Sequence, residues 1–197
     1  RGNTKTSSGS ENEYALESYF SRLNYNYDNR YLLTATIRRD GSSRFKEGNR
    51  YGNFPSASIG WNVHNEEFIP LPSFINQFKV RASYGELGNQ SIGEYQYIPT
   101  INASIPYNWN GNKVFGATQT QVVNQDIRWE TKTTSNIGID ASFLDNMFDL
   151  TAEYYSSVTS DILVDVPIPN TTGAFDPPTV NAGELKNSGL EFALSYN

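Results

Sequence analysis

The sequence predicts an all-β protein: a fragment of an antiparallel transmembrane β-barrel with about seven strands. Three observations lead to this prediction. Seven segments alternate between apolar and polar residues, one face of every segment lacks charge, and short connections alternate with long ones. Aromatic residues reach 14% of the 197-residue chain, and mean hydropathy is −0.56. A low mean hydropathy is compatible with a membrane barrel, because polar and apolar residues average out along each alternating strand.

Each predicted strand presents every second residue to the same side of a sheet. In the second strand, for example, Tyr31, Leu33, Ala35 and Ile37 share one face. The seven predicted strands cover residues 18–27, 31–38, 57–63, 78–85, 136–143, 148–155 and 189–196.

The apolar faces of these strands carry no charged residue, whereas the opposite faces are rich in Asn, Ser, Thr and Gly. A lipid-facing surface has this character, because a cationic side chain at the bilayer midplane costs roughly 2–4 kcal/mol. A soluble β-sandwich also alternates and is the main alternative. To separate the two, we expect Arg to block membrane assembly at Ile59 or Ile139 and to be better tolerated at Ser58 or Gly138.

The connections are expected to sort onto the two sides of the membrane by length. Outer-membrane barrels have short periplasmic turns and longer extracellular loops. The connections expected on the periplasmic side are 28–30, 64–77 and 144–147. Those expected to be extracellular loops are 39–55, 88–130 and 157–185.

Composition argues against several other functions. The chain has no Cys and a single His, His64, so neither a Cys-based metal site nor a multi-His zinc site is available. No GxSxG, Walker A or dinucleotide-binding motif occurs. The net charge of −6, without a strong basic patch, argues against nucleic-acid binding. We therefore expect no enzyme, no catalytic or metal-binding residue and no cofactor.

Two sets of residues are candidates for functional contacts. Charged residues on the polar faces would line the lumen, where they contact other groups or simply pair and solvate the interior. They are Arg22, Arg38, Lys79, Arg81, Asp140, Asp149, Glu153 and Glu191. Aromatic residues in the long loop 88–130 would stack on sugars or pack the loop itself. They are Tyr95, Tyr97, Tyr107, Trp109 and Phe115.

Several stretches resemble the SusC/RagA type of TonB-dependent outer-membrane transporter. The most specific are YLLTATIRRDGSSRF at 31–45, YGNFPSASIGW at 51–61 and FKVRASYGELGNQ at 78–90. Further blocks are DIRWETKTTSNIGID at 126–140, DILVDVPIP at 161–169 and NAGELKNSGLE at 181–191. Their order and spacing fit the family from about residue 14 onward.

The resemblance implies a 22-stranded barrel with an N-terminal plug, in the outer membrane of a Gram-negative bacterium of the Bacteroidetes type. It also implies a SusD-like surface lipoprotein as a lid, energy from TonB, and oligosaccharides or peptides as substrates. The charged lumen residues would then contact plug or substrate, and the loop aromatics would contact substrate or the lid protein. Residues 1–197 would then be part of a single barrel domain, with the plug and the C-terminal part of the barrel expected outside this chain. A passive porin, an adhesin barrel and, less favoured, a soluble all-β carbohydrate-binding module remain the alternatives.

Overall fold

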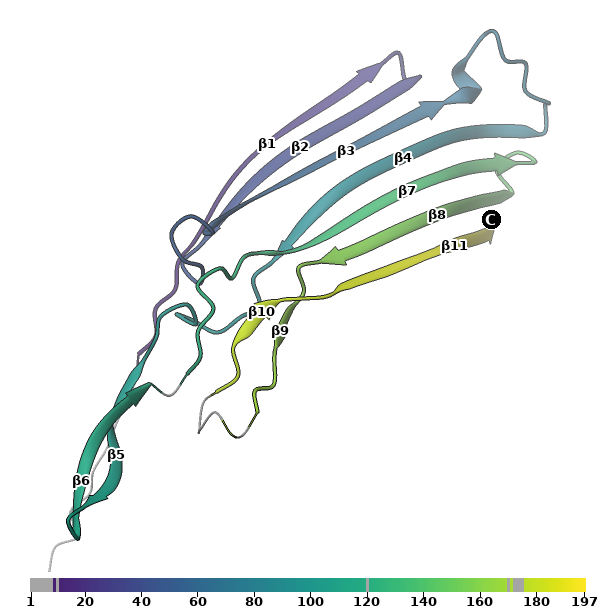
Figure 1. Cartoon of the computed structure of the whole chain (residues 1–197). Helices are drawn as coiled ribbons and strands as arrows, with labels where there is room; N and C mark the ends of the chain where they lie inside the picture. The colour runs from purple at the N-terminus through teal and green to yellow at the C-terminus, as the bar shows by residue number, and fades with distance from the viewer. Residues whose placement is uncertain (1–8, 10, 120, 170, 172–175) are drawn as a thin grey trace, which may run out of the picture.

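The computed structural model, which describes residues 9, 11–119, 121–169, 171 and 176–197, is dominated by one curved antiparallel sheet (Figure 1). Its seven strands run in the order β1-β2-β3-β4-β7-β8-β11. They are β1 (Leu16–Tyr27), β2 (Tyr31–Ser42), β3 (Tyr51–Asn62), β4 (Ile75–Asn89), β7 (Glu130–Phe143), β8 (Phe148–Ser160) and β11 (Glu184–Tyr196). The seven predicted strands are thereby confirmed, and each is longer than its alternating core. No helix in the described part of the chain is long and apolar enough to cross a membrane.

The short connections gather at one end of the sheet and the long ones at the other (Figure 1). At the short end, Asp28 and Asn29 both have a φ of 50° and turn β1 into β2. Leu144, Asp145 and Asn146 also have positive φ and turn β7 into β8. Asn and Asp tolerate this left-handed backbone better than most residues, which explains the tight turns. A single turn of 3-10 helix, η1 (Val63–Asn65), begins the connection from β3 to β4.

The long connections contain more regular structure than the sequence predicts. Residues 39–55 were expected to be a loop, yet β2 continues to Ser42 and β3 begins at Tyr51. Within 88–130 lies a separate hairpin, β5 (Ile101–Trp109) with β6 (Asn112–Gln119). Within 157–185, β9 (Leu163–Asp165) pairs with β10 (Thr179–Asn181). Backbone hydrogen bonding in these hairpins replaces the irregular loops expected from the polar, turn-rich composition.

One face of the sheet is apolar and exposed, as expected for contact with lipid. Ile59 is 59% exposed and Leu194 is 71% exposed, although both are aliphatic. Aromatic rings gather toward the short-turn end of this face: Tyr31 stacks on Trp61 with ring centroids 6.5 Å apart, and Phe148 lies 5.3 Å from Tyr196. Aromatic rings prefer the boundary between lipid tails and water, so this row marks the edge of the apolar band at the short-turn end.

The pairing of β3 with β4 is the shortest between neighbouring strands of the sheet. It covers only Ser56–Asn62, and beyond Ser56 and Gly85 the two strands separate (Figure 1). Pro55 follows at this point, and a proline has no N–H to give to a ladder. The phenyl ring of Phe54 lies beside the separation, so close to Gly52 and Gly88 that a Cβ on either glycine would lie within 2.5 Å of Phe54 Cζ.

A small hydrophobic core at the long-loop end covers the seam, by which we mean the place beyond Ser56 and Gly85 where β3 and β4 stop pairing. Phe45, Phe54, Ile127 and Trp129 are buried there, with partly buried hydrophobic residues packed around them. The Trp129 indole donates a hydrogen bond to the carbonyl oxygen of Arg50 at 3.0 Å. The cluster therefore ties the β2–β3 connection to the segment that precedes β7.

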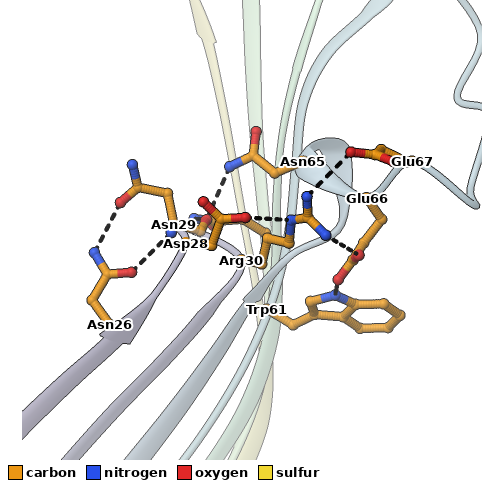
Figure 2. Close-up of polar contacts among 9 residues, drawn as sticks. Asn26, Asp28, Asn29, Arg30, Trp61, Asn65, Glu66 and Glu67 are labelled. Atoms are coloured by element: carbon orange, nitrogen blue, oxygen red, sulfur yellow. Dashed lines mark hydrogen bonds and ion pairs between the residues drawn. The ribbon is translucent and has the colours of Figure 1, made fainter.

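The short-turn end is held by a polar network centred on Arg30 (Figure 2). Its guanidinium lies 3.2 Å from Asp28, 3.7 Å from Glu66 and 3.5 Å from Glu67. Glu66 is the buried member, with a side chain only 2% exposed, and it accepts a hydrogen bond of 2.8 Å from the Trp61 indole. This network joins the β1–β2 turn to the β3–β4 connection.

Replacing Glu66 by Gln is expected to lower the melting temperature at pH 7, with an effect that fades in acid. The Trp61 hydrogen bond, then that from Tyr31 and the charge of Arg30, hold the pKa of Glu66 below its ordinary value of 4.5, against the opposing effect of burial. A depressed pKa in the folded state adds stability above the unfolded pKa, and that stability is lost as the pH falls through the folded pKa. Melting of the protein in detergent, followed by tryptophan fluorescence from pH 7 to pH 3, measures this.

Glu67→Gln is the matched control, because Glu67 contacts the same Arg30 with a side chain that is 91% exposed. It should change the melting temperature little at any pH. A Glu66→Gln penalty of equal size at pH 7 and pH 3 would contradict the assignment.

Candidate functional site

The polar face of the sheet carries the candidate site, and its best-defined element is centred on Arg81. Arg81 lies on β4, and its Nε is 3.1 Å from the carboxylate of Asp140 on β7. Its Nη1 is ion-paired with Glu153 on β8. Thr151 donates a further hydrogen bond of 3.1 Å to Asp140. The strand register produces this arrangement, because Arg81, Gly138 and Glu153 lie in one row across the three strands.

Gly138 leaves the space that the Arg81 side chain occupies. A Cβ at Gly138 would lie 3.1 Å from the carbonyl oxygen of Ala152 and 3.2 Å from the guanidinium carbon of Arg81. Gly138 faces the polar side as predicted, but the Arg81 guanidinium occupies the space beside it. An arginine at Gly138 would therefore collide with Arg81, so this substitution does not test the polar face.

Two other predicted arginines form local contacts on the same face. Arg22 donates to the hydroxyl of Thr36 at 3.2 Å, across the β1–β2 pair. Arg38 pairs with Asp40, whose side chain is 9% exposed, at 2.6 Å. The structure does not join these arginines to the Arg81 cluster; each is held by its own neighbour.

The remaining predicted charges are more scattered. Lys79 lies opposite Asp140 in the β4–β7 register. Asp149 accepts hydrogen bonds from Ser142 at 2.6 Å and Asn197 at 2.8 Å, near the short-turn end. Glu191 lies directly opposite Glu153 in the β8–β11 register, which brings two carboxylates to adjacent strands. Arg81 pairs with Glu153 as well as Asp140, whereas Glu191 adds a further negative charge to this part of the face.

A shallow groove of ≈ 640 Å³ follows the polar face beside the seam. Polar side chains of Arg22, Thr36, Arg38 and Ser58 contribute to its lining. Two phenylalanines that were not among the predicted site residues lie in the same groove: Phe20, which is 77% exposed, and Phe54. The sequence pattern could have revealed them, because each is an apolar residue on an otherwise polar face of its strand.

The predicted loop aromatics fall into separate groups rather than one cluster. Tyr107 and Trp109 share one face of the β5–β6 hairpin, while Phe115, opposite Pro106, lies on the other face. Trp109 is 68% exposed and Phe115 is 64% exposed. Tyr95 lies outside the hairpin and donates a hydrogen bond to the carbonyl oxygen of Glu13, and Tyr97 is half-buried. Only the hairpin therefore presents several of these rings to the surroundings.

A second polar cluster at the long-loop end was also not anticipated. Arg128 pairs with Asp161 at 2.6 Å, and that hydrogen bond, followed by the charge of Asp161, raises the pKa of Arg128. The Asn181 side chain accepts from the amide of Arg128 and donates to the carbonyl oxygens of Arg128 and Asp161. These contacts fix the entry to β7 against the exit of β8.

The described residues contain no group of three or more His, Cys, Asp or Glu side chains arranged to hold a metal ion. What the polar face offers is a wall of paired charges, hydroxyls and amides on a rigid sheet. Such a surface suits reversible contact with a hydrated solute or a polar protein surface.

Comparison with known proteins identifies the sheet. The sequence profile described as "TonB dependent receptor-like, beta-barrel" matches residues 1–197. The chain belongs to this family. TonB-dependent receptors of this kind are outer-membrane proteins, so the exposed apolar face of the sheet is the lipid-facing side of a membrane barrel. The predicted fold class and location are confirmed.

Curated relatives narrow the resemblance within the TonB-dependent receptors. TonB-dependent receptor SusC of Bacteroides thetaiotaomicron is 38% identical over 186 residues, covering 91% of this chain and 18% of SusC. TonB-dependent receptor P39 of Formosa agariphila is 38% identical over 193 residues, covering 98% of this chain and 18% of that receptor. The chain thus spans about a fifth of the length of these relatives.

Solved structures of a siderophore receptor and of the RagAB transporter resemble this chain as well. The RagAB peptide transporter matches with a TM-score of 0.79 and 31% identity, over 93% of this chain and 20% of that one. The siderophore receptor PirA of Pseudomonas aeruginosa matches with a TM-score of 0.59 and 17% identity, over 91% of this chain and 30% of that one, and supports the fold alone. The predicted resemblance to the SusC/RagA type is confirmed.

Proposed function

We propose that this chain forms part of the barrel wall of an active outer-membrane importer of oligosaccharides or peptides. The observation that carries the proposal is the joint likeness to SusC and to the RagAB peptide transporter across nearly the whole chain. The 197 residues supply one section of the wall, and transport belongs to the complete receptor.

The partners proposed for the complete receptor are a SusD-like surface lipoprotein and TonB. The family description and the names of the relatives support coupling to TonB. TonB would act through a plug domain, which we place outside residues 1–197, together with the C-terminal part of the barrel.

In this proposal the polar face lines the lumen. Arg81 and Lys79, which lies opposite Asp140 in the register, balance the charges of Asp140 and Glu153, so the wall stays hydrated without presenting a strong field of one sign. Such a lining allows uncharged sugars or mixed-charge peptides to pass the wall without a deep electrostatic trap. The other candidate charges, including Arg22 and Glu191, would contribute to the same surface.

Uptake of labelled substrates by cells that carry the full-length receptor tests the proposed function. Active import predicts that accumulation of an oligosaccharide or peptide mixture stops when TonB is deleted or the proton gradient is collapsed. Accumulation that continues unchanged in the absence of TonB would identify a passive porin instead. No accumulation in either strain, with the receptor assembled in the membrane, would favour an adhesin.

Replacing Trp109 by Ala is expected to reduce uptake several-fold at limiting substrate. Trp109 and Tyr107 share an exposed face of the β5–β6 hairpin at the long-loop end, and loss of one stacking ring costs roughly 1 kcal/mol. Initial uptake rates across a range of substrate concentrations measure the effect, which should raise the half-saturating concentration.

Phe115→Ala is the matched control for this prediction. Phe115 is similarly exposed but lies on the opposite face of the hairpin, beside Lys113. Equal losses for both variants would remove the special role of the Tyr107 and Trp109 face.

A further inference from the structure

The lipid-facing side of the sheet carries an unusual arginine, Arg39, near the long-loop end of β2. It follows four outward residues, Tyr31, Leu33, Ala35 and Ile37, on the same face of β2. Eight residues separate Arg39 from Tyr31, roughly 26 Å along a strand, or roughly 20 Å across the membrane at the usual tilt. With the reach of its side chain, the Arg39 guanidinium therefore lies at the outer edge of an apolar band about 25 Å tall.

The N–H groups of Arg39 have no acceptor within the described part of the chain, although its charge attracts the Glu17 carboxylate. Arg39 is the one described arginine whose guanidinium makes no hydrogen bond or ion pair to a protein acceptor. The guanidinium lies over the Tyr51 ring, with 4.7 Å from its carbon to the ring centroid. A guanidinium has five N–H donors, so Arg39 retains a full set for an outside acceptor.

The nearby carboxylate is engaged elsewhere. Glu17 accepts a hydrogen bond from Tyr51 at 2.8 Å on one oxygen and another from Tyr19 on the other. Glu17, Tyr19, Arg39 and Tyr51 line a depression on this outer face. The two tyrosines and Glu17 therefore build its walls, and Arg39 supplies a guanidinium whose N–H groups have no acceptor among the described residues.

The surroundings match a lipid with an anionic head. Asn53 lies opposite Arg39 in the β2–β3 register and adds an amide donor on the same face. Below the depression, toward the membrane centre, Leu23 is 60% exposed and Ile37 is 55% exposed, which leaves an apolar track for an acyl chain. A guanidinium favours phosphate because it can donate two parallel hydrogen bonds to it.

From this geometry we infer that Arg39 and its tyrosine-lined depression bind the phosphate of an outer-leaflet lipid. The lipid's acyl chain lies along Leu23 and Ile37. The site is on the outside of the barrel wall, separate from the polar face, and it does not depend on which solute the receptor imports.

Binding of lipid A to the full-length receptor in detergent tests this inference. Native mass spectrometry or a fluorescent lipid A titration should show roughly tenfold weaker binding for Arg39→Gln, with most of the affinity kept in Arg39→Lys. Lys113→Gln is the matched control, because Lys113 also lies over an aromatic ring but on the β5–β6 hairpin. Heat-modifiable gel mobility confirms that each variant has a folded barrel.

Two further probes separate the lipid from a free anion and from apolar contact. Dephosphorylated lipid A should bind the native receptor and Arg39→Gln equally, and inorganic phosphate at millimolar concentration should not displace lipid A. The inference fails if Arg39→Gln binds lipid A as tightly as the native receptor does. It also fails if inorganic phosphate competes fully, which would indicate a general anion site.

Discussion

Replacing Ile59 by Arg is expected to prevent stable insertion of the receptor in the outer membrane. Ile59 lies on the lipid-facing side of β3, two residues inside the aromatic row at Trp61, is 59% exposed, and neighbours Leu33 and Ala82 in the register. A cationic side chain costs roughly 2–4 kcal/mol at the bilayer midplane and less toward the interfaces, and even part of this cost is a large share of the net stability of a protein. Urea unfolding of the receptor in lipid vesicles, together with its yield in isolated outer membranes, measures the loss.

Ser58→Arg is the matched control, one residue away on the polar face. Ser58 lines the open groove beside Thr34 and Ser83, where an added guanidinium reaches water. It should cost far less than Ile59→Arg in the same assay. If both variants insert equally well, the assignment of the apolar side to lipid is wrong. Gly138→Arg is no substitute for this control, since Arg81 occupies the space beside that residue.

Replacing Phe54 by Ala is expected to lower the free energy of unfolding by about 3–5 kcal/mol, the usual loss for a buried phenyl ring. Phe54 is 4% exposed and contacts Trp129 edge to face, with ring centroids 5.5 Å apart. Its ring covers the seam where β3 and β4 stop pairing, so few other contacts can replace it. Urea unfolding of the full-length receptor, followed by tryptophan fluorescence, measures the change.

Phe20→Ala provides the comparison, because Phe20 is aligned with Phe54 through Arg38 but is 77% exposed. Its removal should have a much smaller effect. Gly88→Ala supplies a second check: its Cβ would lie 2.0 Å from Phe54 Cζ, so it should destabilise the native receptor and do so much less in the Phe54→Ala background. Strictly additive effects of Gly88→Ala and Phe54→Ala would contradict the packing described for the seam.

The sequence predicts the sheet well because lipid on one side and water on the other impose a period of two on every strand. The alternation that places Leu33 and Ile59 on one face is the same alternation that sets their register in the structure. Strand ends are harder to locate, since alternation weakens once both faces reach water. Arg39 and Asp40 belong to β2 although their charges suggest a loop.

The loop hairpins show where alternation was available but missed. Asn110 and Gly111 both have positive φ, and an Asn-Gly pair between alternating residues favours a two-residue hairpin turn. The β5–β6 hairpin could therefore have been predicted. The short β9–β10 pair could not, because three residues per strand give too little pattern to distinguish from a loop.

The sequence predicts which face of the sheet each site residue lies on, but it does not predict which residues contact one another. Alternation placed Arg81, Asp140 and Glu153 together on the polar face, but their contact requires the register among β4, β7 and β8, which depends on pairing across a connection of 40 residues between β4 and β7. Phe54 illustrates the converse, because its parity suggests a polar environment. It is buried only because loop residues distant in sequence, such as Trp129, come to cover it.

The ladder between β4 and β7 joins Asn89 to Glu130 at the long-loop end, although the whole β5–β6 hairpin lies between them in sequence. The strands of the inserted hairpin pair with each other and form a separate sheet, so the seven-stranded wall does not depend on them for its hydrogen bonds. Doubling the length of such a loop costs only about 0.6 kcal/mol of closure entropy. Evolution can therefore exchange or lengthen the surface hairpins while the strands below keep their register, and receptors with one inherited wall can diversify in what they capture.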